Sequence, residues 1–218
     1  MDRRFIIILA VVVLGLGGIF FVGKIKSNST NSGANTTVGS TSNHTTGGNA
    51  KNVNLLVYGD FQCPVCGQFH PIEKKVVDTY KNDILFTFRH FPLDSIHPNA
   101  RAGARAAEAA GMQGKFFEMH DLLYENQSTW SQSTNPLSFF TTYATQLGLD
   151  VDKFRADFAS ETVNNTINAD LKEGNQKGVT GTPTYYLNGK KLENGDIGSY
   201  EKFSAVIEEA IKNASGNN

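Results

Sequence analysis

The chain has 218 residues, of which 39% are hydrophobic and 19% are charged, and its formal net charge is −1 at pH 7. This balance fits one globular domain with additional segments, and it excludes a wholly disordered chain. The near-neutral charge gives no reason to expect nucleic acid as a partner. The chain has only two cysteines, Cys63 and Cys66, which excludes a disulfide-rich secreted framework.

The chain begins with an apolar segment. Residues 5–23 carry no charge, and as a helix of about 1.5 Å per residue they would extend about 28 Å, close to the roughly 30 Å of a bilayer core. No A-x-A cleavage site follows them, so residues 1–26 are predicted to be an uncleaved signal anchor with one transmembrane helix. A cleaved signal peptide is the alternative. Two basic residues flank each side, so charge alone does not decide the orientation.

The next segment has a different composition. Residues 27–52 consist almost wholly of Ser, Thr, Asn and Gly, which cannot bury a core. They are predicted to form a flexible linker between the anchor and the folded part.

A β-α-β unit is predicted next. Residues 53–58 form a short apolar run typical of a buried strand, and residues 84–89 read as a second strand. Between them, a helix is predicted from Cys63 to about Tyr80, with a kink at Pro71. Its apolar residues recur at helical spacing: Phe69, Ile72, Val76 and Tyr80.

The end of the chain predicts a β-β-α unit. Residues 184–187 and 190–192 are predicted strands, and Asn188-Gly189 between them is a strong two-residue hairpin signal. Ser199 can cap a final helix. The folded domain is therefore expected to span residues 53–213, followed by a disordered tail at 214–218.

An all-helical insertion is predicted between the two units, from about residue 95 to residue 178. Asn135-Pro136 looks like a helix start, with Pro at the first helical position. Asp150 and Ser160 are further candidate N-caps, and Gly178 is a candidate helix end.

The Cys63-Pro64-Val65-Cys66 motif is the strongest candidate for chemistry. A helix N-terminus favours the thiolate of Cys63 by up to about 2 kcal/mol, and the thiolate is the nucleophile in disulfide exchange. The spacing places Cys66 one turn later, where it can resolve a mixed disulfide. Pro64 fits the first helical turn. We therefore expect Cys63 to be exposed, Cys66 to be shielded, and the pKa of Cys63 to be roughly 5–7.

Two other uses of the cysteines remain open. A structural disulfide across so short a loop would contribute roughly 2 kcal/mol, in a domain large enough to fold without it. Zinc could use Cys63, Cys66 and His70, but a structural site needs four ligands and no second close cysteine pair exists. No metal and no cofactor are therefore predicted.

Several other side chains have ambiguous sequence signals. His70, on a face of the predicted helix, is expected to be a solvated imidazole. The separated His90, His97 and His120 are expected to be surface residues or satisfied core residues. Trp130 either borders a substrate surface or closes the core of the insertion.

The segment from Tyr58 to Phe69, YGDFQCPVCGQF, followed by Gly181-Thr182-Pro183-Thr184, resembles the DsbA-like branch of the thioredoxin superfamily. The resemblance extends from Val53 to about Ile211. It implies an α/β thioredoxin fold with an all-helical insertion, in which Thr182-Pro183 is a cis peptide bond packed against the cysteines. From the residues alone, a trans Pro183 opening an ordinary strand is the alternative.

The resemblance also implies residue roles. Cys63 and Cys66 would be the catalytic pair, assisted by Pro183, while Thr182, Pro64 and Val65 would contact the substrate chain. The pattern departs from the family at two positions. Val57 occupies the place of an acidic residue buried beneath the second cysteine, and Asp60 is not expected to replace it. Val65 stands where the strongest oxidants have histidine.

These features together predict a protein-disulfide oxidoreductase, anchored through residues 5–23 in a prokaryotic cell membrane with its catalytic domain outside the cytoplasm. The expected reaction is disulfide donation to reduced exported proteins. A membrane quinone-linked oxidase, implied by the family, would reoxidise the dithiol. A disulfide reductase or isomerase is one alternative, and a tethered chaperone or binding module without enzymatic activity is the other.

Overall fold

The computed structural model describes residues 39–215. The predicted transmembrane helix and residues 27–38 of the predicted linker lie outside this range. Within it, no helix combines the length and the apolar character needed to cross a membrane.

A five-stranded sheet in the order β1-β3-β2-β4-β5 forms the centre of the domain. Strands β2 and β3 are parallel, and the other neighbours are antiparallel. The strands are β1 His44–Thr46, β2 Val53–Gly59, β3 Ile84–His90, β4 Thr184–Leu187 and β5 Lys190–Lys191. The predicted β-α-β and β-β-α units are therefore confirmed, with one additional strand at the β3 edge.

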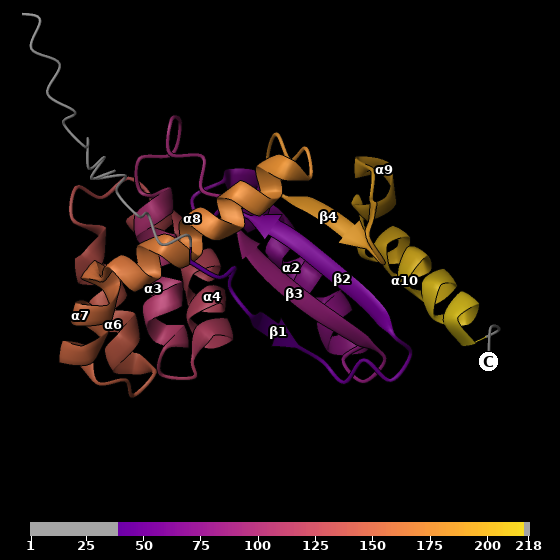
Figure 1. Cartoon of the computed structure of the whole chain (residues 1–218), viewed down its shortest axis with the longest axis horizontal. Coiled ribbons are helices and arrows are strands. Elements are labelled where there is room, and N and C mark those ends of the chain that lie inside the picture. The colour runs from indigo at the N-terminus through magenta and orange to yellow at the C-terminus, as the bar shows by residue number, and fades with distance from the viewer. Residues whose placement is uncertain (1–38, 216–218) are drawn as a thin grey trace, which may run out of the picture. The chain divides into compact units, whose positions relative to one another are not determined.

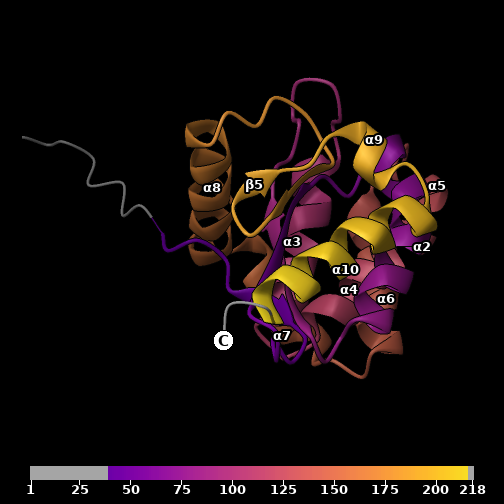
Figure 2. The ribbon, with the colours of Figure 1, turned by 90° about the vertical axis from the view of Figure 1, so that its right-hand side faces the viewer.

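Helices cover both faces of this sheet. Figure 1 shows α8 in front of the strands and α2 behind them, and Figure 2 shows α10 on the same side as α2. Helices α3, α4, α6 and α7 gather beyond one end of the sheet (Figure 1). The helices are α2 Pro64–Thr79, α3 Ala100–Gly111, α4 Phe116–Glu125, α5 Gln127–Trp130, α6 Pro136–Gln146, α7 Val151–Ala159, α8 Glu161–Gln176, α9 Asn194–Ile197 and α10 Tyr200–Ser215.

The helix boundaries follow local signals in the sequence. Asp150 accepts a hydrogen bond from Lys153 N at the start of α7, and Ser160 accepts one from Val163 N at the start of α8. Gly178 follows α8 with a φ of 74°, a conformation that favours glycine. The all-helical insertion is confirmed, and α10 continues to Ser215, two residues beyond the predicted end of the domain.

The prediction of a flexible linker is wrong for residues 39–52. Strand β1 pairs with β3 in antiparallel register, from His44 opposite Phe88 to Thr46 opposite Phe86. Ser42 is buried, and its N–H and hydroxyl donate to the carboxylate of Asp170 at 2.7 and 2.6 Å. Backbone pairing and distant side chains therefore order a segment that has almost no apolar residues of its own.

A group of polar side chains fastens β1 to the domain. The Nε2 atoms of His44 and His90 both donate to Oε1 of Glu108, each at 2.7 Å. Burial opposes the charge of Glu108, but the hydrogen bonds and the electrostatic attraction of the two histidines together outweigh it and lower the pKa of this carboxyl group to about 2. We refer to this group as the β1-edge cluster, which consists of Ser42, His44, His90, Glu108 and Asp170.

Candidate active site

The cysteine motif lies where β2 ends and α2 begins. Cys63 is the N-cap residue of α2, and Pro64 takes the first helical position, as predicted. The N–H of Cys63 donates to Asp60 O at 3.1 Å, which closes the turn after β2. From the insertion, Nε2 of Gln127 donates to the carbonyl oxygens of Phe61 and Cys63, both at 2.8 Å. The helical insertion therefore helps to hold the first cysteine in position.

A cis peptide bond joins Thr182 to Pro183 beside the motif, as the family resemblance implied. The thiol of Cys63 donates to the carbonyl oxygen of Thr182 at 3.3 Å. These groups come from segments 119 residues apart, and they meet because β4 begins beside the end of β2. The structure thus brings together three predicted site residues, Cys63, Thr182 and Pro183.

The two cysteines are free thiols and both are buried, with 5% of Cys63 and 4% of Cys66 exposed. The expectation that Cys63 would be exposed is therefore wrong, because the segment around Thr182 covers it. The other two predicted contact residues, Pro64 and Val65, are exposed, and 46% of Val65 is accessible. A substrate approaching Cys63 would meet these two side chains.

The thiols differ in acidity rather than in exposure. A hydrogen bond from the Cys66 thiol is the largest cause that lowers the pKa of Cys63 to about 5, against the opposing effect of burial. The side chain of Thr182, whose buried hydroxyl has no other partner, and the N–H groups of Cys66 and Val65 act in the same direction by stabilising the thiolate. At neutral pH a thiol with this pKa is about 99% thiolate.

Cys66 has the opposite character. Burial raises its pKa well above the ordinary value, and the hydrogen bond and charge of Cys63 raise it further. Proton removal is therefore easy at Cys63 and difficult at Cys66. The value for Cys63 falls at the acidic end of the predicted range, but its main cause is the partner thiol and not the helix N-terminus that the sequence suggested.

The place of the family's buried acid is apolar here, because Val57 is 1% exposed and pairs with Tyr185 across the sheet. The carboxylate of Asp60 accepts hydrogen bonds from Gln62 N, Leu93 N and His97 Nδ1. These three hydrogen bonds hold the Asp60 carboxylate at the turn after β2. This position agrees with the expectation that Asp60 does not replace the missing acid.

Sequence reasoning missed a buried carboxylate on α2. Glu73 is 5% exposed and accepts a hydrogen bond from the hydroxyl of Tyr185 at 2.8 Å. Burial raises the pKa of Glu73 to about 7. Residues four and three positions apart share a helix face, so the series Cys66, His70, Glu73 could have revealed this polar face. The expectation of a solvated His70 is wrong, because this imidazole is only 4% exposed.

Three of the remaining ambiguous residues belong to the core, and the fourth, His97, is half-buried. Trp130 is fully buried, and its Nε1 donates to Leu123 O at 2.8 Å, so it closes the core of the insertion. His90 and His120 are also buried. His97 pairs with Asp60, as the reading of a satisfied histidine expects.

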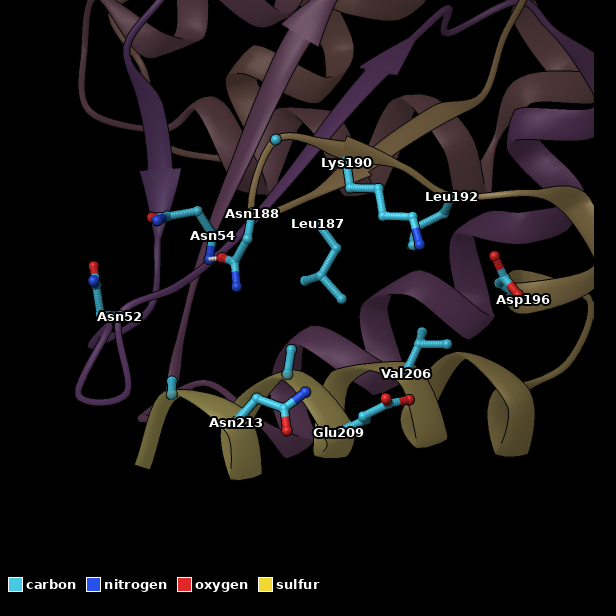
Figure 3. Close-up of a pocket in the computed structure, with 13 residues that line it drawn as sticks. Asn52, Asn54, Leu187, Asn188, Lys190, Leu192, Asp196, Val206, Glu209 and Asn213 are labelled. Carbon is cyan, nitrogen blue, oxygen red and sulfur yellow. Dashed lines mark hydrogen bonds between the residues drawn. The ribbon is translucent and has the colours of Figure 1, made fainter. Parts of the chain in front are cut away.

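A groove of about 790 Å³ lies at the other end of the central strands, between the β4–β5 hairpin and α10. Figure 3 shows Asn54, from the start of β2, opposite Glu209 and Asn213 of α10. Seven residues of β2 separate this end from the turn before Cys63, a distance of roughly 20 Å. No cysteine lines this groove, so it is separate from the thiol site despite its size.

Comparisons with known proteins agree with this architecture. The sequence family described as thioredoxin matches residues 40–209. The crystal structure of Wolbachia pipientis alpha-DsbA1 is 21% identical, with a TM-score of 0.69, and the match covers 79% of this chain and 92% of that one. Oxidised BdbD from Bacillus subtilis is 22% identical, with a TM-score of 0.66, and the match covers 80% and 97%.

A curated relative of a different kind is the Na(+)/H(+) antiporter NhaA 1 of Salinispora arenicola, which is 38% identical over 170 residues. This match covers 77% of the present chain but only 24% of the antiporter, so the chain spans about a quarter of that relative's length. The family match covers most of the chain, and the geometry of the cysteines and of Thr182-Pro183 agrees with it. The chain therefore belongs to the thioredoxin family, and it shares its fold with the solved structures of alpha-DsbA1 and BdbD, as the predicted resemblance to the DsbA-like branch implied.

Proposed function

We propose that the protein is a membrane-anchored protein-disulfide oxidoreductase that donates disulfides to reduced exported proteins. The unequal acidity of the two thiols is the observation that carries this proposal. Stabilising the Cys63 thiolate favours the reduced form of the pair, and a protein with a stabilised reduced form is an oxidant toward other thiols.

The reaction follows from this asymmetry. In the oxidised protein, a substrate thiolate attacks Sγ of Cys63, the Cys63–Cys66 bond breaks, and Cys66 leaves as a thiolate that then takes a proton. A second substrate thiolate attacks the substrate sulfur of the mixed disulfide and releases Cys63 as its stable thiolate. The substrate loses two electrons and gains a disulfide, and the Cys63–Cys66 disulfide takes up those two electrons and becomes a dithiol.

The residues around Cys63 are suited to hold an extended substrate chain. Thr182 and Pro183 precede β4, and Pro64 and Val65 are exposed beside the thiol. A substrate cysteine reaching Cys63 would pass between these two segments. Backbone contacts near Thr182 and apolar contacts with Val65 depend little on substrate sequence, which suits an enzyme that acts on many proteins.

The cellular setting rests on the sequence. The apolar residues 5–23 are long enough for a membrane anchor, and disulfides persist outside the cytoplasm, where an oxidant is useful. We therefore place the catalytic domain outside the membrane. Reoxidation of the dithiol by a membrane quinone-linked oxidase would complete the cycle, since each substrate disulfide leaves the protein reduced.

Equilibration of the cysteine pair with glutathione redox buffers tests the direction of the reaction. We expect a reduction potential well above that of thioredoxin, about −270 mV, since the Cys63 thiolate is stabilised. A potential at or below this value would favour the reductase alternative. A Cys63→Ala, Cys66→Ala double variant tests the chaperone alternative. If the protein acts as a chaperone, this variant keeps its activity. If the protein acts as an oxidoreductase, the variant loses all of its activity.

A further inference from the structure

Two groups of histidine and glutamate side chains are buried in the domain, and their pairing differs. In the β1-edge cluster, two imidazoles already donate to one carboxylate oxygen of Glu108. The other group contains His70 and Glu73 on α2 and His120 on α4, and is called the α2–α4 cluster below. Its three residues are 4%, 5% and 3% exposed.

The imidazoles of the α2–α4 cluster have nitrogens without hydrogen-bond partners. Both ring nitrogens of His70 and the Nε2 of His120 are buried and unpaired. Leaving such atoms unpaired inside a protein costs roughly 1–3 kcal/mol each, so an unpaired set that converges on one point calls for an explanation. One ligand atom from each of His70, Glu73 and His120 lies within 4.8 Å of the others.

We propose that the α2–α4 cluster is a binding site for a divalent transition-metal ion of the zinc type, held by the imidazoles of His70 and His120 and the carboxylate of Glu73. Two histidines and one carboxylate are a ligand set that zinc uses when a water molecule completes a tetrahedron. Ligand atoms about 2.0–2.2 Å from such an ion lie roughly 3.4 Å from one another. Nε2 of His120 and Oε1 of Glu73 are 3.9 Å apart, and all three ligand atoms lie within 4.8 Å of one another, so each pair has to approach by at most about 1.4 Å to reach this spacing.

Outer residues orient these ligands. Nδ1 of His120 donates to Oδ1 of Asp121 at 3.0 Å, which turns the lone pair of Nε2 toward Glu73. Metal-binding histidines commonly have such a carboxylate behind them. The other oxygen of Glu73 accepts from Tyr185, so Oε1 remains free for an ion. The ammonium group of Lys74, which borders the same cavity as the three ligands, forms an ion pair with Asp121 at 2.9 Å.

Access to the cluster also favours a metal ion. A cavity of about 210 Å³ borders all three ligands and offers a path from solvent. The cysteines are not part of this set, although Cys66 lies one helical turn before His70.

Zinc titration of the full chain, without a histidine tag and with the Cys63–Cys66 disulfide formed, tests the proposal. Oxidation removes the thiolates as competing ligands, so we expect one zinc ion per chain. His70→Gln and His120→Gln should each weaken binding more than about 100-fold, because loss of an outer carboxylate alone costs roughly 10–100-fold. Asp121→Asn should fall within that smaller range, and His44→Gln, in the β1-edge cluster, should bind zinc as the unmodified chain does.

Cobalt(II) provides a readout that needs no variant. The oxidised chain should give the visible absorption of a tetrahedral cobalt site with nitrogen and oxygen ligands, and zinc should displace it. Absence of stoichiometric binding would overturn the proposal. So would equal zinc affinity in the His70→Gln, His120→Gln and His44→Gln variants, or binding that appears only when the cysteines are reduced and that carries sulfur-to-cobalt charge transfer.

Discussion

The dithiol site and the β1-edge cluster both contain buried polar groups, but they differ in how these groups are paired and in how far their pKa values are shifted. At the β1 edge, the carboxylates of Glu108 and Asp170 each accept at least two hydrogen bonds, and Nδ1 of His90 is the one fully buried side-chain atom of this cluster without a partner. At the dithiol site, the hydroxyl of Thr182 has no partner, and two buried thiols hold opposite acidities.

We infer from this difference that the β1-edge cluster stabilises the fold and that the dithiol site carries out the chemistry. Buried carboxylates that accept several hydrogen bonds fix one arrangement of the chain, whereas thiols with strongly shifted pKa values remain available to a substrate or a proton. We therefore expect variants of the dithiol site to change reactivity with little change in stability. Variants of the β1-edge cluster should do the reverse.

The largest effect is expected from Cys63→Ser, which should abolish disulfide donation because the reactive sulfur is lost. Oxidation of a reduced model peptide in a glutathione buffer measures it. The matched control is Glu209→Gln in the groove at the far end of the sheet, which should retain the unmodified rate. Activity that remains in Cys63→Ser, or is lost in Glu209→Gln, would contradict the assignment of the reaction to the cysteine end of the sheet.

The two cysteines should differ in the intermediates that they leave behind. Cys66→Ser removes the resolving thiol, so mixed disulfides between Cys63 and client proteins should accumulate. Cys63→Ser should trap few, because the high pKa of Cys66 keeps it a thiol. Non-reducing electrophoresis with mass spectrometry of the adducts detects them. Equal trapping by both variants would refute the assignment of nucleophile and resolver.

The β1-edge cluster should show its effect in stability and in its dependence on pH. The pKa of Glu108 is depressed from 4.5 to about 2 in the folded protein, so its contribution is present above about pH 4.5 and is lost as pH falls toward 2. The shift corresponds to roughly 3 kcal/mol. Urea unfolding at pH 6 should show Glu108→Gln to be less stable by up to this amount.

Urea unfolding near pH 2 is the control for that experiment. Near pH 2 the difference in unfolding free energy between the two proteins should shrink, because Glu108 is then almost wholly protonated in the unfolded chain and about half protonated in the folded one. Peptide oxidation at pH 7 by Glu108→Gln should match that of the unmodified chain. A difference that persists near pH 2, or a changed oxidation rate, would contradict the separation of the two regions.

The smallest effect is expected at Val65. An imidazole at this exposed position can donate to the Cys63 thiolate, so Val65→His should lower the pKa of Cys63 by less than about 1 unit and make the protein more oxidising. Val65→Ala separates loss of the valine from gain of a donor, and it should leave the pKa nearly unchanged. Thiolate absorbance as a function of pH measures both, and an unchanged pKa in Val65→His would mean that its ring does not face the sulfur.

Much of the fold could be predicted because its signals are local. Helix α2 begins at Pro64, and Asn188-Gly189 forms the turn between β4 and β5, with positive φ at both residues. Asp150 and Ser160 begin their helices through hydrogen bonds to residues three positions later. In each case the residues that determine the structure are neighbours in the sequence.

The features that sequence reasoning missed depend on distant partners. The Ser- and Thr-rich segment before β2 is ordered by β3 and by Asp170, 128 residues after Ser42. At the active site, the sequence identified the cysteines and Pro183, but it could not show that Thr182 covers Cys63 or that Glu73 meets Tyr185. Such contacts depend on packing between elements, which no local pattern encodes.

Strand β1 has a further consequence for a protein whose proposed substrates are unfolded chains. Such chains carry unpaired backbone groups that add readily to the open edge of a sheet and begin aggregation. Here the seven-residue strand β3 is covered by β1, which has three residues, and the opposite edge is β5, whose two residues are exposed lysines. Within residues 39–215 the sheet therefore presents no long bare edge, so an unfolded client can exchange a disulfide and depart without being drawn into the sheet.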